Sequence, residues 1–123
     1  MATGFTDRGK GKSIVGMNIY SVQTGIIASP THTQVAAVPL TAQNCFLATV
    51  ASINNAVRLP PAQAGMEITV INQAANAAGT YPSGTDTINA GAASAPVSLP
   101  TGSGGATPVV IFYCAVDGKW FSK

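Results

Sequence analysis

The side chains that could carry out chemistry are few and lie far apart in the sequence. His32 is the only histidine, and it lies in a turn-like stretch, Pro30–Thr33, between two candidate strands. A general base or a metal ligand would need a second group at a suitable spacing, and the sequence around His32 offers none. We therefore expect His32 to be an exposed loop residue.

The acidic residues are equally dispersed, at positions 7, 67, 86 and 117, and no two of them form a local pair. Glycoside hydrolysis needs paired carboxylates, and a calcium loop needs more acids than Asp86–Asn89 contains. Ser103 is not in a Gly-x-Ser-x-Gly elbow, and the glycines around it lack the Lys-Ser/Thr ending of a phosphate-binding loop. We expect no catalytic residue, no metal site and no cofactor, and hence a structural or binding module rather than an enzyme.

The two cysteines, Cys45 and Cys114, each lie inside an apolar, β-like run. Neither belongs to a Cys-x-x-Cys pair, and a free cysteine in such a run behaves as a small buried hydrophobe. A disulfide bridge between them is the alternative that the sequence leaves open.

Charged residues are scarce: only 8% of the 123 residues are Asp, Glu, Lys or Arg, where an ordinary soluble domain has about 25%. Four of the ten lie in the first twelve positions, and the other six are three acids and three bases, which leaves that part of the chain with no net charge. Uncharged polar side chains lose their water at an interface more cheaply than ions do. The composition favours a self-associating protein, with a solvated monomer as the alternative.

Residues 1–16 are predicted to form a flexible basic N-terminal arm, and residues 17–123 a single β domain. Three cations among glycines give weak affinity for phosphates, so we expect no specific nucleic-acid binding. We expect instead that the arm lies across an acidic neighbouring subunit and becomes ordered there, and the alternative is an arm without a role. The candidate partner-binding residues are Arg8, Lys10, Lys12 and Arg58.

No membrane span or export signal is expected. The longest apolar run, residues 109–116, has eight residues, whereas a bilayer-spanning helix needs about twenty. The N-terminal residues contain no apolar stretch that would form the core of a signal peptide. We expect synthesis in the cytoplasm.

Short apolar or alternating runs between Gly, Pro and Asn predict an all-β fold. The predicted strands are 18–22, 34–40, 45–50, 56–59, 66–71, 86–89, 95–99, 109–116 and 119–121, with loops at 62–65, 74–84 and 102–105. In one of these strands Met66, Ile68 and Val70 should face a core while Glu67 and Thr69 face away.

Asp117-Gly118 predicts a two-residue hairpin turn with positive φ at both central positions. No helical periodicity persists for three turns, and the sequence contains no internal repeat of the kind that a solenoid shows. The predicted fold is a compact antiparallel β-sandwich or jelly-roll-like barrel with a flexible N-terminal arm.

Three segments in the second half of the chain, Val57–Asn72, Tyr81–Asn89 and Phe112–Trp120, contain in order an R-L-P-P turn, a G-M-x-x-T-V-x-N strand, a turn that ends in I-N, and an F-Y-C-x-x-D-G-x-W hairpin. This order resembles small structural proteins of tailed bacteriophages. One departure is Thr85, which separates Gly84 from Asp86 where the pattern has them adjacent, so this loop can differ in shape.

The resemblance implies a virion component, either a capsid decoration protein or a domain of a tail or fibre. The compact β body, the neutral surface and the basic arm favour the first, so we expect the protein on the capsid surface, made in the host cytoplasm. Its expected function is that of a capsid decoration, or cement, protein that binds the major capsid protein of the same virion and ties neighbouring coat subunits together. The family commonly sits at local threefold points, so a homotrimer is favoured among homo-oligomers. The alternative is a receptor- or carbohydrate-binding β domain of a phage tail or fibre.

Overall fold

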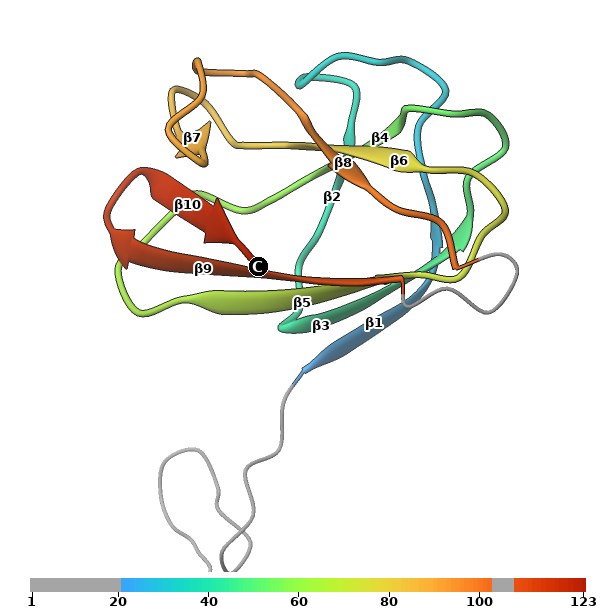
Figure 1. Ribbon diagram of the computed structural model, residues 1–123, viewed down its shortest axis with the longest axis horizontal. Coiled ribbons are helices and arrows are strands. Elements are labelled where there is room, and N and C mark those ends of the chain that lie inside the picture. The colour runs from blue at the N-terminus through green and yellow to red at the C-terminus, as the bar shows by residue number, and fades with distance from the viewer. Residues whose placement is uncertain (1–20, 103–107) are drawn as a thin grey trace, which may run out of the picture.

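The strands of the chain form two packed layers (Figure 1). The computed structural model describes residues 21–102 and 108–123. The strands are β1 (Val22–Ile27), β2 (Val38–Pro39), β3 (Asn44–Thr49), β4 (Asn55–Arg58), β5 (Glu67–Asn72), β6 (Ala78–Tyr81), β7 (Thr87–Ile88), β8 (Val97–Leu99), β9 (Val109–Val116) and β10 (Lys119–Ser122). The described residues contain no helix, and so none that could cross a membrane, and the all-β prediction is confirmed.

One layer is a six-stranded sheet in the order β1-β3-β5-β9-β10-β7, and the other is a four-stranded sheet in the order β2-β4-β6-β8. From β1 to β9 successive strands alternate between the two sheets. Among the first six strands, each runs in the same direction as the previous strand of its own sheet: β1, β3 and β5 are parallel, as are β2, β4 and β6. The sheets are therefore mixed rather than antiparallel, with five of the eight strand pairs parallel.

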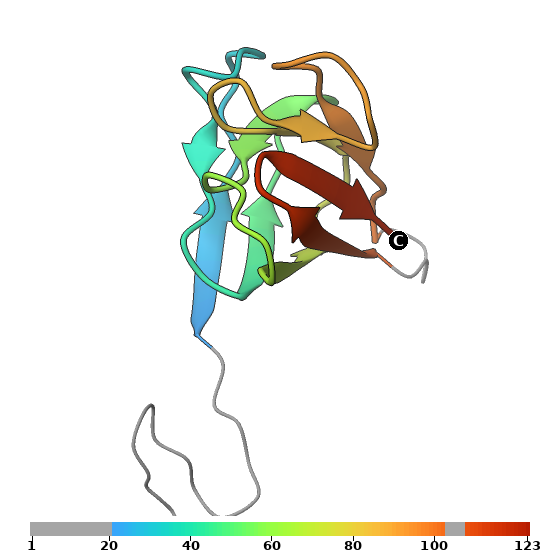
Figure 2. The ribbon, with the colours of Figure 1, turned by 90° about the vertical axis from the view of Figure 1, so that its left-hand side faces the viewer.

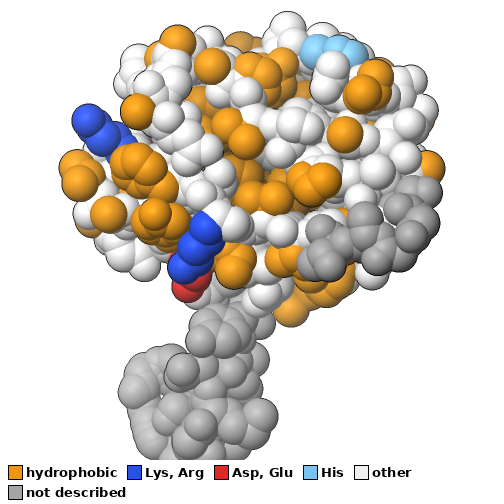
Figure 3. Space-filling view, viewed as in Figure 1, with side chains coloured by type: hydrophobic (Ala, Val, Ile, Leu, Met, Phe, Trp, Pro, Cys, Tyr) orange, Lys and Arg blue, Asp and Glu red, His pale blue; other side chains and the backbone are white. Residues whose placement is uncertain are grey.

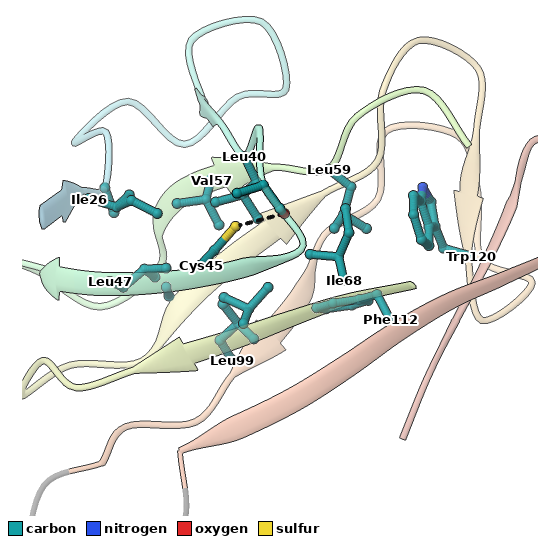
Figure 4. Close-up of a cluster of buried hydrophobic side chains, with 14 of the residues drawn as sticks. Ile26, Leu40, Cys45, Leu47, Val57, Leu59, Ile68, Leu99, Phe112 and Trp120 are labelled. Atoms are coloured by element: carbon teal, nitrogen blue, oxygen red, sulfur yellow. Dashed lines mark hydrogen bonds between the residues drawn. The ribbon is translucent and has the colours of Figure 1, made fainter. Parts of the chain in front are cut away.

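The hydrophobic core lies between the two sheets (Figure 4). Trp120 and Phe112 are its largest fully buried side chains. They come from the six-stranded sheet, and Val57 and Leu99 come from the four-stranded one. Burial of each such side chain stabilises the fold by roughly 1.5–3 kcal/mol, so the two sheets hold each other through this layer.

The C-terminal hairpin is confirmed, but its turn differs from the predicted one. Figure 2 views the molecule from the end where this hairpin turns. Only Gly118 has a positive φ, of 82°, and the strand register shifts between Lys119 and Trp120. A left-handed glycine beside a register shift is typical of a bulged hairpin rather than of a two-residue turn with two left-handed residues.

At three places the observed strands add to or differ from the prediction. The strand expected at 18–22 lies for the most part outside the described residues, and β1 occupies Val22–Ile27. The residues from Gln34 to Ala37 form a turn, because Thr33 accepts hydrogen bonds from Ala36 and Ala37, and only Val38–Pro39 are extended. The third is β6, which lies inside the expected loop 74–84.

Candidate interaction surfaces

The predicted partner-binding residues fall in two places. Arg8, Lys10 and Lys12, with the rest of the predicted arm, lie outside the described residues. Arg58 ends β4 and is half-buried. The structure therefore gives contacts for one of the four residues only.

Arg58 holds a loop of its own chain. The loop at residues 29–37, which we call the covering loop, lies against the four-stranded sheet. Nη1 of Arg58 donates to the carbonyl oxygens of Gln34 at 2.9 Å and Val35 at 3.3 Å. The hydroxyl of Tyr81 donates to the carbonyl oxygen of His32 at 2.8 Å, which attaches the loop a second time. Binding of a partner by Arg58 stays a prediction, and its observed hydrogen bonds stabilise the loop.

His32 is exposed, as predicted. Its Nε2 lies 3.1 Å from Oδ1 of Asn55. A hollow of about 280 Å³ beside it is lined by His32, Asn54, Gly79, Tyr81, Pro96, Val97 and Ser98. Within residues 21–102 and 108–123 no three His, Cys, Asp or Glu side chains come together as metal ligands. The hollow offers hydrogen bonds and one aromatic side chain to a ligand.

Two of the acidic side chains hold the segment before β5. Oδ2 of Asp86 accepts a hydrogen bond from the backbone N–H of Ala62 at 2.8 Å, and Oδ1 of Asp117 accepts one from Ala64 at 2.8 Å. A carboxylate that receives a backbone N–H stabilises the local chain conformation. These two acids have a structural role that the sequence pattern did not reveal.

Cys45 and Cys114 are both free and buried, so the bridge that the sequence left open is absent. The thiol of Cys45 donates to the carbonyl oxygen of Ala42 at 3.3 Å (Figure 4). Burial of Cys45 raises the pKa of its thiol above the ordinary value. Burial therefore makes Cys45 a weak nucleophile.

The side of the six-stranded sheet that faces away from the core is rich in apolar side chains, and we call it the outer face. Its apolar residues are Phe46, Ile71, Val109, Ile111, Tyr113 and Phe121. Phe46 lies opposite Ile71, and Ile71 lies opposite Val109. Directly paired residues of neighbouring strands point to the same side of a sheet. These residues therefore form one surface across four strands.

Tyr113 and Phe121 form the aromatic part of the outer face, which we call the ridge. Their ring centroids are 5.9 Å apart, and Nζ of Lys123 lies 5.2 Å from the centroid of Tyr113. Tyr113 is 37% exposed, so the ridge remains open to a partner. Figure 3 shows hydrophobic side chains gathered over the β9–β10 hairpin, beside two basic side chains.

A polar hollow of about 220 Å³ adjoins the ridge on the same face. It is lined by Gln43, Asn44, Glu67 and Thr69. Glu67 lies directly opposite Tyr113 in the strand register, so the hollow begins where the ridge ends. The outer face therefore combines the aromatic ridge, which has Lys123 beside it, with a polar hollow that Glu67 lines.

Sequence reasoning missed this surface, although the sequence contains a signal for it. Two of the aromatic residues, Phe112 and Trp120, lie in the core. Each is followed by a second aromatic residue, Tyr113 or Phe121. Successive side chains of a strand point to opposite faces, so an aromatic pair in a strand places one ring on each side of the sheet.

Comparison of the chain with protein-family models, with curated proteins and with solved structures found no match.

Proposed function

We propose that this chain is a virion structural protein that decorates the assembled capsid and stabilises it by bridging neighbouring coat subunits. The partner is the major capsid protein of the same virion, and the chain acts as a homo-oligomer, for which the resemblance favours a trimer. The proposal applies to the capsid surface and involves no enzymatic step.

The observation that supports the proposal most is the nature of the outer face. It presents six aliphatic or aromatic side chains, with Tyr113 and Val109 more than a third exposed. Large exposed apolar surface on a small domain marks a site that another molecule covers. Because charged residues are scarce, few ions would lose their water when a partner covers this surface, so the desolvation cost is small.

The chain would stabilise the shell by holding neighbouring coat subunits together. A module that binds only the assembled shell stabilises it by mass action, because disassembly must also break the contacts of the module. The body suits this role, since its two sheets share one core and the covering loop is fixed by Arg58 and Tyr81. The basic residues Arg8, Lys10 and Lys12 would add an electrostatic contact to an acidic coat subunit.

A second candidate function is recognition of a receptor or carbohydrate by a tail or fibre domain. The hollow beside His32 favours it, because Tyr81 and Asn54 supply an aromatic side chain and an amide at one depression. Sugars bind to such combinations of an apolar ring and hydrogen-bonding groups.

Co-sedimentation separates the two functions. The purified chain is mixed with empty shells of its own virion, and in parallel with host surface glycans immobilised on beads. Saturable recovery with the shells and none on the beads supports the decoration function. Saturable recovery on the beads, with none on the shells, would replace it by the second function.

A further inference from the structure

The edges of the two sheets are poorly suited to pairing with another chain. The edge strands β2 and β7 have two residues each, and β8 has three. The longest edge strand, β1, contains Gly25 with a φ of 68° and shifts its register twice against β3. Short edges and bulged edges discourage strand addition. Association through a face of the sandwich is therefore favoured over extension of a sheet.

The two faces of the sandwich differ in how they are covered. The four-stranded sheet is overlaid by the covering loop, which Arg58 and Tyr81 hold in place. The outer face of the six-stranded sheet has no comparable cover among the described residues, and Val109 and Tyr113 are 38% and 37% exposed there. The outer face is thus an apolar surface that the described residues leave open to a partner.

The charges on the outer face indicate what that partner is. Lys123 lies over the ridge, and Glu67 lines the adjoining hollow. The face therefore carries one base on its projection and one acid in its depression. A second copy of the same face matches both charges. Lys123 on the ridge of the second copy would lie against Glu67 in the hollow of the first copy. An acidic or a basic partner of another kind would match one feature and oppose the other.

We infer that the outer face is the surface through which copies of this chain associate, with the ridge of one copy seated in the Glu67 hollow of the next. This inference deepens the proposed function and rests on it for its setting on the capsid.

The first test measures the native mass of the purified full chain over a range of concentrations, without any shell present. We expect an oligomer for the natural sequence. Tyr113→Lys removes the aromatic ring and adds a charge at the ridge, and should weaken association about tenfold or more. The matched control is Val35→Lys, because Val35 is also an exposed aliphatic side chain, at 87%, but lies in the covering loop. It should leave the mass unchanged, and circular dichroism should show both variants folded.

The second test uses the two charges and does not depend on the ridge variant. Glu67→Lys leaves two bases at the contact, and Lys123→Glu leaves two acids, so each variant alone should associate more weakly than the natural chain. Mixed together, the two variants should associate more strongly than either variant alone, because a contact between unlike copies pairs an acid with a base. Recovery on mixing can arise only from a contact between copies.

A monomer at every concentration would overturn the inference, as would an oligomer that Tyr113→Lys and Val35→Lys affect equally. An oligomer that is lost only when residues 1–20 are removed would assign association to that segment and also overturn it. These measurements do not involve the shell. The inferred self-association surface can therefore be wrong while capsid decoration is correct, and capsid decoration can be wrong while the self-association surface is correct.

Discussion

Nη1 of Arg58 donates a hydrogen bond to the carbonyl oxygen of Gln34 at 2.9 Å, and so joins the end of β4 to the covering loop. Arg58 was a candidate for partner binding, and this contact gives it a role inside the chain. Hydrogen bonds made by charged groups are stronger than neutral ones, and half-burial of Arg58 shields this one in part from water.

Arg58→Ala should therefore lower the free energy of unfolding by about 1–2 kcal/mol. Urea denaturation measures the change. Lys119→Ala removes a fully exposed cation and is the matched control, expected to change stability by less than about 0.5 kcal/mol. Equal effects of the two substitutions would mean that the Arg58 contact contributes nothing specific.

Thr80→Val should stabilise the protein. Thr80 is fully buried between Val57 and Val97 of the neighbouring strands, and its Oγ1 has no hydrogen-bond partner among the residues that the structure describes. Replacing an unpaired buried hydroxyl by a methyl of similar size removes its desolvation cost, so unfolding should require about 1 kcal/mol more. Thermal unfolding measures the gain. Thr80→Ser keeps the hydroxyl and serves as the control, and a Val variant less stable than the natural chain would contradict the assignment.

Stability should fall as the pH rises above about 9. Burial raises the pKa of Cys45 in the folded chain above its ordinary value of 9.0. Above that pH the unfolded chain loses the thiol proton while the folded chain keeps it, so unfolding is favoured. Denaturation midpoints between pH 7 and pH 10 measure the slope, and Cys45→Ala should reduce it. An unchanged slope in that variant would show that another group causes the dependence.

Removal of residues 1–13 should leave the fold intact and abolish most affinity for the shell, if the basic arm clasps a coat subunit. The charge is tested separately by replacing Arg8, Lys10 and Lys12 with Gln in the full-length chain. Both variants should bind shells more weakly, and their binding should depend less on salt concentration than that of the natural chain. Equal affinity of the truncated and natural chains would refute the clasp.

Short sequence patterns predicted those parts of the fold that depend on residues close together in the sequence. The alternation of Ile68 and Val70 with Glu67 identified β5 and its buried side, and Asp117-Gly118 identified the terminal hairpin. The burial of Cys45 and Cys114 also followed from their apolar surroundings.

The rest depended on contacts between distant parts of the chain. All four residues of β6 are buried, so the strand shows no alternation. One of them is Gly79, where a Cβ would lie 3.3 Å from the carbonyl oxygen of Asn54. A run of small residues in which apolar and polar side chains do not alternate resembles a loop when only the sequence is considered. The parallel pairs join strands that a strand of the other sheet separates in the sequence, which no short window records. The hollow depends on one of these pairs, because Asn44 lies opposite Thr69.

Scanning calorimetry of empty shells, with and without the purified chain, tests the central claim most directly. Decoration predicts that the shells melt at a higher temperature as the chain is added, up to saturation at a fixed number of copies per coat subunit. Shells whose melting temperature stays the same at saturating concentrations of the chain would contradict the claim.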